Sequence, residues 1–100
     1  MTKVTVALPP LDEGRSAIIE VAGQRVLLCR TAAGLHAMDE HCPHQNFSME
    51  GARVRHNSVM CPHHGARFSL EDGRSLSQLT TKALRLFPCA ARGDVLDIDI

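Results

Sequence analysis

The chain has 100 residues, of which 44% are hydrophobic, and its 11 Lys and Arg balance its 11 Asp and Glu. This length predicts one domain around a single core, and the zero net charge argues against a nucleic-acid or membrane-surface partner, for which a basic excess is expected. The N-terminus lacks the continuous apolar segment of a secretory signal, and no run approaches the roughly 18 apolar residues of a membrane span. We therefore expect a cytoplasmic protein, in which four Cys would not normally form two disulfides.

The first part of the chain predicts short strands separated by turns. Four strands are expected: Thr2–Leu8, Ser16–Val21, Arg25–Thr31 and Leu35–Met38. Pro9-Pro10 ends the first, because proline has no N–H to donate to a neighbouring strand. The turn Ala22-Gly23-Gln24 predicts a hairpin between the second and third strands, and Ala33-Gly34 predicts the next turn.

The rest of the chain predicts a long loop followed by more strands. The loop covers Asp39 to Gly51, and the expected strands are Ser58–Met60, Arg67–Leu70, Ala83–Ala91 and Asp94–Ile100. Glu71-Asp72-Gly73 is a predicted turn, Arg92-Gly93-Asp94 turns a terminal hairpin, and polar Ser77–Thr81 has no clear element. No amphipathic helix is evident, so the sequence predicts an all-β fold.

Two short motifs combine Cys with His. They are Cys42-Pro43-His44 and Cys61-Pro62-His63-His64-Gly65, separated by sixteen residues, 45–60. Thiolate and imidazole ligands select zinc, copper or an iron–sulfur centre. Common zinc sites pair Cys with Cys and His with His, whereas here each motif is mixed. Two such motifs can give two Cys to one metal and two His to another, which suits a two-iron cluster with unlike ends. A zinc site is the alternative.

The pattern C-P-H-x16-C-P-x-H-G-x-x-F, over residues 42 to 68, resembles the signature of Rieske [2Fe–2S] proteins. It is most similar to the Rieske-type ferredoxins of bacterial aromatic-ring-hydroxylating dioxygenases. The resemblance implies one [2Fe–2S] cluster with four protein ligands: Cys42 and Cys61 on the inner iron, and His44 and His64 on the outer, solvent-facing iron. It implies a Rieske-like antiparallel β-sandwich or incomplete barrel, a single domain over residues 1–100, with an inserted cluster-binding subdomain at approximately 39–70.

The same resemblance implies an electron-transfer component and not an enzyme in its own right. Such a protein takes one electron from an NAD(P)H-dependent flavin reductase and passes it to a terminal Rieske oxygenase, through transient contacts. We expect the outer imidazoles to form the exit and entry edge. The residues expected around this edge are Gln45, Asn46, Phe47, His63 and Ala66.

Two differences from the respiratory Rieske proteins have consequences. Each motif of those proteins has an extra Cys, and the two extra cysteines form a disulfide. Here Phe47 and His63 occupy the matching positions, so this disulfide cannot form. Ser and Tyr hydroxyls that donate to the cluster sulfurs are replaced by Ala66 and Phe68. Fewer donors stabilise the reduced state less, so we expect a potential toward the low end of the Rieske range, about −150 mV.

The family's proline-containing cover loop has no proline here within Leu76–Thr81, so we expect Leu76 or Leu79 to shield the cluster. Cys29 and Cys89 are expected to be small hydrophobes, and a disulfide between them is not expected in a reducing compartment.

The remaining histidines are not expected to be ligands. His36 is predicted to be a surface or half-buried histidine and His56 to lie in a solvated turn. His63 should point away from the metal and lie exposed, either as part of a docking surface or simply as a surface residue.

Three other classes of protein are alternatives to this hypothesis. An oxygenase with its own mononuclear iron needs a further domain, for which 100 residues leave no room. A small subunit resembling that of assimilatory nitrite reductase would have the same fold but often lacks the cluster, which the intact Cys and His motifs count against. The third class is a zinc-binding interaction module.

Overall fold

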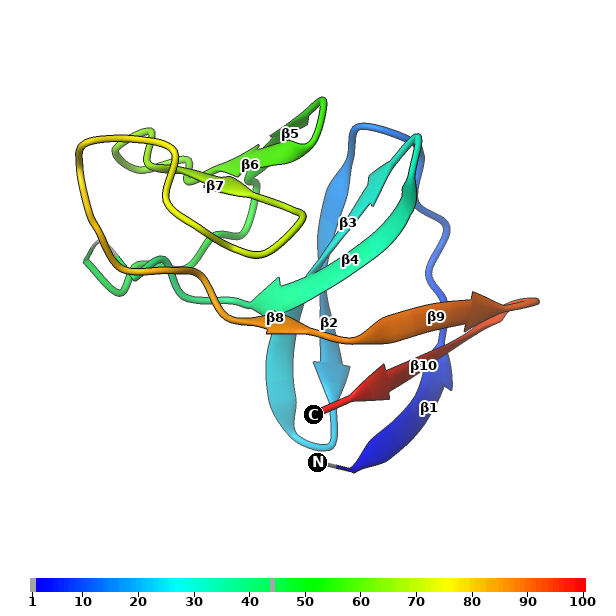
Figure 1. Ribbon diagram of the computed structural model, residues 1–100. Helices are drawn as coiled ribbons and strands as arrows, with labels where there is room; N and C mark the ends of the chain where they lie inside the picture. Colours follow the sequence, from blue (N-terminus) through cyan, green and yellow to red (C-terminus); the bar gives the residue numbers. More distant parts are fainter. Residues whose placement is uncertain (1, 44) are drawn as a thin grey trace.

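The computed structural model describes residues 2–43 and 45–100, and its regular structure consists of antiparallel strands (Figure 1). The strands are β1 (Lys3–Ala7), β2 (Ser16–Val21), β3 (Gln24–Thr31), β4 (Gly34–Asp39), β5 (Arg53–Arg55), β6 (Ser58–Met60), β7 (Arg67–Ser69), β8 (Leu86–Phe87), β9 (Cys89–Arg92) and β10 (Val95–Asp99). Nowhere in these residues is there a helix with the length and apolarity required to cross a membrane. The predicted all-β class is confirmed.

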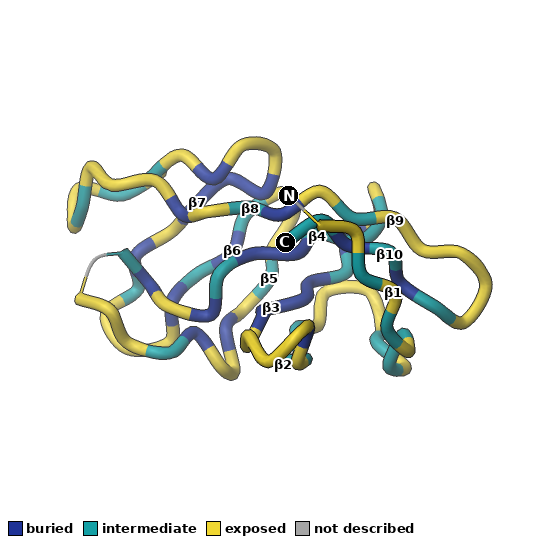
Figure 2. The backbone as a smooth tube through the Cα atoms, turned by 90° about the horizontal axis from the view of Figure 1, so that it is seen from below, coloured by how far each residue is buried: buried dark blue, intermediate teal, exposed yellow. Residues whose placement is uncertain are grey.

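The strands form three sheets with the orders β1-β10-β9, β2-β3-β4-β8 and β5-β6-β7. The second sheet lies between the other two sheets, and both of its faces are buried. In β3, Val26 and Leu28 pack with Leu96 of β10, whereas Leu27 and Cys29 pack toward the third sheet and the loops around it. Alternate side chains of a strand point to opposite faces, so burial on both faces explains the continuous apolar run 26–29. In Figure 2, β3 lies in the interior and most of its tube has the colour of buried residues.

The first two sheets form an open sandwich, and the third sheet with its flanking loops lies beyond one end of it (Figure 1). The third sheet is small, since each of its strands has three residues. It attaches through Val59 and Phe68, both fully buried against the second sheet's side chains. This arrangement confirms the expected sandwich with an inserted subdomain; the boundaries 39–70 stay a prediction.

The predicted single strand Ala83–Ala91 is wrong. The structure divides it at Pro88, so that β8 pairs with β4 in the second sheet while β9 pairs with β10 in the first. Proline cannot donate to a ladder, which interrupts the strand, but the Pro88 carbonyl still accepts a hydrogen bond from the Asp99 N–H at 2.9 Å. Pro88 is therefore where the chain passes from one sheet to the next.

The sequence did not predict β5, which has only three residues, two of them arginine. It pairs with β6 across a tight turn at His56 and Asn57, where His56 has a φ of 54°. His56 is exposed, as predicted for a solvated turn. Strands this short have too few residues for an alternation of apolar and polar positions to be recognised.

Candidate metal centre

The first Cys–His motif lies in a loop, residues 42–47, that follows the end of β4. The Cys42 N–H donates to the Phe47 carbonyl at 2.8 Å, and the Asn46 N–H donates back to the Cys42 carbonyl at 2.7 Å. Asn46 has a φ of 61°, a left-handed conformation that asparagine tolerates better than most residues. These bonds close the loop around the Cys42 side chain. His44 lies outside the residues that the structure describes.

The second motif lies in a loop, residues 61–66, that joins β6 to β7. The Cys61 N–H donates to the Ala66 carbonyl at 2.8 Å, and the Gly65 N–H donates to the Cys61 carbonyl at 3.1 Å. Gly65 has a φ of 79°, a left-handed conformation that glycine adopts without steric cost. The two loops therefore have the same pattern of backbone hydrogen bonds, and Cys42 corresponds to Cys61.

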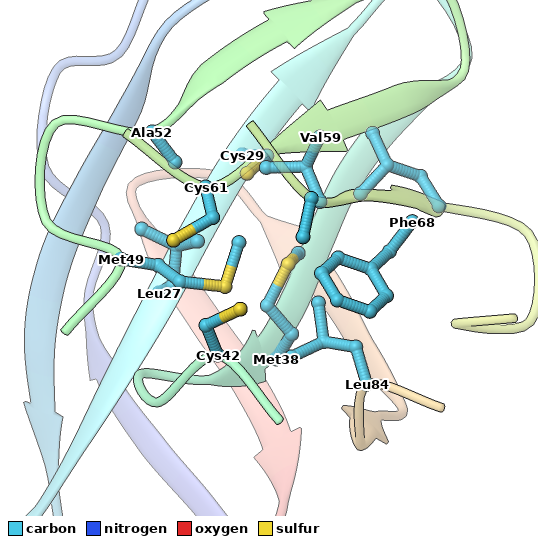
Figure 3. Packing of buried hydrophobic residues seen from close by; sticks show 12 residues of the cluster. Leu27, Cys29, Met38, Cys42, Met49, Ala52, Val59, Cys61, Phe68 and Leu84 are labelled. Carbon is cyan, nitrogen blue, oxygen red and sulfur yellow. The ribbon is translucent and has the colours of Figure 1, made fainter. Parts of the chain in front are cut away.

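Both cysteines are buried, with exposed fractions of 1% for Cys42 and 2% for Cys61. They belong to one apolar cluster together with Met49, and in Figure 3 the sulfur atoms of these three residues are directed into the same region. Two thiols from separate segments of the chain thus share an environment from which water is excluded. A buried end with two thiolate ligands is what the inner iron of the expected cluster requires.

Met49 was missed as the apolar neighbour of the cysteines. Its side chain is fully buried, whereas Leu76 and Leu79, the expected cover, are 38% and 45% exposed. The Met49 N–H donates to the Glu40 carbonyl at 2.7 Å, which places the side chain inside. A lone methionine within the polar segment 45–50 was the only signal that could have identified it.

Glu40, which lies before the first motif, stabilises the first loop through its side chain. This carboxylate is nearly buried, at 5% exposure, and accepts a hydrogen bond from the Ser48 hydroxyl at 2.8 Å. It also forms an ion pair with Arg25 at 3.1 Å, so its buried charge has partners. Since Glu40 and Ser48 lie on either side of the loop, their bond holds its two ends together. No sequence pattern predicts this contact.

His64 is exposed, unlike the cysteines, and so is its neighbour His63. The Phe47 ring lies next to both: its centroid is 4.8 Å from that of His63, in a stacked arrangement at 28°, and 5.6 Å from that of His64. The imidazole side of the site therefore faces solvent. Gln45, Asn46, Phe47 and His63 are exposed as expected around this edge, but Ala66 is buried and is not part of that surface.

Phe47 and His63 occupy the positions at which the respiratory Rieske proteins have their disulfide cysteines. Their stacked rings connect the first loop to the second at the place where a covalent bridge is expected in the respiratory proteins. Ala66 and Phe68, at the positions of the missing hydroxyls, are both fully buried. Neither side chain can donate a hydrogen bond to a cluster sulfur.

The other two cysteines are free thiols that pack in different apolar clusters, Cys29 on β3 of the second sheet and Cys89 on β9 of the first. Cys29 is fully buried, and burial raises the pKa of its thiol to about 12. Metal ligation requires the thiolate, so a pKa this high disfavours Cys29 as a ligand. Cys89 is half-buried, and burial likewise raises its pKa. The two residues behave as the predicted small hydrophobes.

His36 forms a local contact away from the loops. It is half-buried, and one ring nitrogen lies 3.1 Å from the Thr31 hydroxyl. Burial lowers its pKa, so the neutral imidazole is favoured. Its place in β4 agrees with the prediction of a half-buried histidine.

Within residues 2–43 and 45–100, no three Cys, His, Asp or Glu side chains surround a single point where a metal ion could be held. A [2Fe–2S] cluster of mixed ligation does not need such a group, because each iron takes only two protein ligands and sulfide completes the rest. Two buried thiols on equivalent loops and an exposed imidazole beside them fit this cofactor.

Comparison with known proteins identifies the family. Residues 4–88 match the family model of the Rieske [2Fe-2S] domain. The chain belongs to the Rieske family. Its cofactor is accordingly one Rieske-type [2Fe–2S] cluster, as the resemblance of the two motifs implied.

Curated relatives include two ferredoxin components. The chain is 27% identical to the ferredoxin component of the naphthalene 1,2-dioxygenase system of Pseudomonas aeruginosa, over 95% of this chain and 91% of that one. It is 31% identical to the ferredoxin component of the alkene monooxygenase system of Xanthobacter autotrophicus, over 87% and 71%. A third relative, cholesterol 7-desaturase of Caenorhabditis elegans, is 42% identical over 56% of this chain, which spans only 14% of that longer protein.

Solved structures confirm the Rieske ferredoxin fold. The ferredoxin of carbazole 1,9a-dioxygenase from Nocardioides aromaticivorans matches with a TM-score of 0.82 at 20% identity, covering 95% of this chain and 96% of that one. A complex of reduced oxygenase and oxidised ferredoxin in carbazole 1,9a-dioxygenase contains a chain that matches with a TM-score of 0.82 at 17% identity, over 95% and 92%. A protein described as a nitrite reductase (NADPH) small subunit also scores 0.82, at 20% identity, over the full length of both chains.

Proposed function

We propose that this Rieske protein is a one-electron carrier that accepts electrons from an NAD(P)H-dependent flavin reductase and passes them to a terminal ring-hydroxylating oxygenase. The observation that carries the proposal is the polarity of the site: two buried thiols at one end and an exposed imidazole at the other. The near full-length match to dioxygenase ferredoxin components supports it. A cytoplasmic location is part of this proposal.

The proposed ligands are Cys42 and Cys61 for the inner iron and His44 and His64 for the outer iron. When bound, the cluster supplies reversible one-electron oxidation and reduction. The protein's part is to hold the thiolates away from water and to present an imidazole at the surface. Because both loops are closed by their own backbone hydrogen bonds, we expect little movement when the charge changes. No substrate turnover is expected from the protein alone.

The exposed rings around His64 are proposed as the contact surface for redox partners. Phe47 is 43% exposed, and Gln45, Asn46 and His63 lie next to it at the surface. A small patch of this kind suits a transient complex. Replacing Gln45 by Glu should slow electron transfer to at least one partner in stopped-flow measurements. Unchanged rates with both reductase and oxygenase would contradict this contact surface.

A low reduction potential is part of the proposal. Ala66 and Phe68 provide no hydroxyl to the cluster sulfurs, so the reduced and more negative state receives fewer hydrogen bonds. We expect a potential near the low end of the Rieske range, about −150 mV. A redox titration of the purified protein measures it. A value above that of the standard hydrogen electrode would be incompatible with the proposal.

The deciding experiment is spectroscopy followed by reconstitution. The purified protein should be red-brown, and electron paramagnetic resonance after reduction should show mixed Cys and His ligation. A colourless protein with bound zinc would instead indicate a zinc-binding interaction module. Adding the protein to a flavin reductase and a ring-hydroxylating oxygenase should then restore NAD(P)H-dependent turnover.

A second candidate is the small subunit of a nitrite reductase, which the full-length structural match favours. Both functions use the same fold, so the fold does not separate them. The intact pair of Cys–His motifs counts against a clusterless subunit. Stimulation of a ring-hydroxylating oxygenase but not of a nitrite reductase catalytic subunit would decide for the carrier.

A further inference from the structure

A second surface of the molecule carries a strong local charge. A groove of about 610 Å³ lies between the start of β2 and the hairpin of β5 and β6. Of the described residues that line it, four are arginines, Arg15, Arg53, Arg55 and Arg67, and none is acidic. The whole chain has 11 basic and 11 acidic residues. More than a third of the positive charge therefore surrounds one groove, while the acidic residues lie elsewhere.

These arginines are available for a partner. All four are exposed, and the ion pairs among the described residues involve other arginines, at positions 25, 74 and 92. The Arg67 guanidinium donates to the Leu76 carbonyl at 3.5 Å, a long contact with a neutral group. Four neighbouring guanidinium groups without carboxylates repel one another, so an anionic partner would lower the energy of this surface.

The groove lies over the outer face of the third sheet. In the register of β5-β6-β7, Arg53 is opposite Met60 and Met60 is opposite Arg67, while Arg55 is opposite Ser58. Cross-strand neighbours and alternate residues of a strand share a face, so these groove residues lie on the side away from Val59 and Phe68, which are buried in the core. The Ser16 hydroxyl donates to the Ala52 carbonyl at 2.7 Å and joins β2 to the segment before β5.

We propose that this groove binds an extended acidic segment of a protein partner, lying over the outer face of β5 with carboxylates at alternate residues. Arg53 and Arg55 are two positions apart on a strand, roughly 6.6 Å, which is also the spacing of alternate residues in an extended peptide. Met60 gives the groove an apolar contact beside Arg53. A small or β-branched residue between the carboxylates would fit against it.

Other anions fit these observations less well. A phosphate group would use one or two guanidinium groups, whereas the four here are distributed along the groove, three on β5 and β7 and the fourth, Arg15, directly before β2. Nucleic-acid binding usually accompanies a strongly basic domain, and this chain has a pI near 7.0. The groove also differs from the proposed contact surface for electron exit, because His64 does not line it. Met60 does, directly before Cys61, so a segment bound here would lie close to the second loop.

The test uses the cluster-containing protein and a fluorescent peptide of alternating Glu and Thr. Fluorescence anisotropy should show binding that weakens as salt is added. The double substitution Arg53→Gln and Arg55→Gln should weaken binding about tenfold, the result of losing two exposed arginine–carboxylate contacts. The matched control is Lys3→Gln with Lys82→Gln, which removes the same charge from exposed positions outside the groove and should leave binding unchanged. The cluster's absorption spectrum, unchanged in both variants, shows that the fold is intact.

Three outcomes would overturn the proposal. The first is no binding of the peptide at low salt. The second is an equal loss of affinity in the two double variants, which would mean attraction to overall charge. The third is equal binding of a peptide with the same composition but all its Glu in one block, or displacement by inorganic phosphate at the peptide's own concentration. That result would assign the groove to small anions instead of an extended strand.

Discussion

The two Cys–His loops, residues 42–47 and 61–66, have one backbone pattern and two different sets of side chains. In each, the Cys N–H donates to the carbonyl five residues later, and its carbonyl accepts from the N–H four residues later. Asn46 and Gly65, at the equivalent fourth position, both have positive φ. This shared backbone pattern accompanies a buried cysteine in each loop, since Cys42 and Cys61 have nearly the same low exposure.

The loops differ in where they place their other groups. The proposed histidine ligand is two residues after Cys42 but three residues after Cys61, so the ligands do not follow the backbone equivalence. At the last position of each loop, Phe47 is exposed and Ala66 is buried. The second loop is held by strands on both sides, whereas the first depends on Glu40 and on the stack of Phe47 with His63. A shared backbone thus fixes the buried end, and the side chains determine the exposed end.

The largest expected effect comes from removing either thiol. Cys42→Ser and Cys61→Ser should each abolish stable cluster binding, because the equivalent loops supply one inner ligand apiece and a hydroxyl is a poor ligand for this centre. Iron and acid-labile sulfide analysis with visible absorption measures the loss. The matched control is Cys29→Ala, a buried cysteine of the same apolar cluster that should keep its iron. A Cys61→Ser protein with full iron content would show that the loops are not equivalent in binding.

The next effect separates two adjacent histidines. His64→Ala should lose the mixed-ligand signal in electron paramagnetic resonance, whereas His63→Ala should keep it. His63 is two residues after Cys61, just as His44 is two residues after Cys42. The equivalence of the loops alone would therefore favour His63 as the ligand. Loss of the signal in His63→Ala, with retention in His64→Ala, would mean that the ligands follow the backbone pattern and would overturn the assignment.

The fold class, most strands and both motifs could be predicted because they depend on local patterns. Ser16–Val21 was predicted with the same bounds that the structure has, since β-branched residues and a turn at Gly23 define that strand locally. The spacing of Cys and His over residues 42 to 68 is specific enough to identify the family. These features need no knowledge of which segments pack together.

What could not be predicted depends on contacts between distant segments. The division of the last strands at Pro88 follows from pairing with β4 on one side and β10 on the other, partners that lie far away in sequence. The Glu40–Ser48 bond and the burial of Met49 depend on the path of an irregular loop. The arginines of the groove come from separate stretches of the chain, and only folding brings Arg15 beside Arg53.

A smaller effect tests the backbone equivalence. Gly65→Ala should lower stability by about 1–2 kcal/mol, because an L-residue is strained at a φ of 79°. The added methyl group would meet only the Met60 sulfur at 3.9 Å, so the cost is conformational and not steric. Asn46→Ala should cost less, since asparagine already carries part of that strain. Thermal unfolding of the cluster-containing proteins should show a decrease of about 5–10 °C for Gly65→Ala.

The comparison of the stability losses in Gly65→Ala and Asn46→Ala tests whether the two loops are equivalent. A larger loss from Asn46→Ala than from Gly65→Ala would mean that the asparagine side chain supports the first loop by a contact of its own. In that case the equivalence of the loops would hold for their hydrogen bonds but not for their energetics.

The smallest expected effect concerns the contact that links the two loops. Phe47→Ala removes the ring stacked on His63 at 4.8 Å, and we expect a loss of about 0.5–1 kcal/mol because the Phe47 ring is 43% exposed. Thermal unfolding of Phe47→Ala, His63→Ala and the double variant forms a double-mutant cycle. Its coupling energy should account for most of the Phe47 effect. Purely additive losses would show that the rings lie together without stabilising each other, and that Glu40 alone secures the first loop where a disulfide is absent.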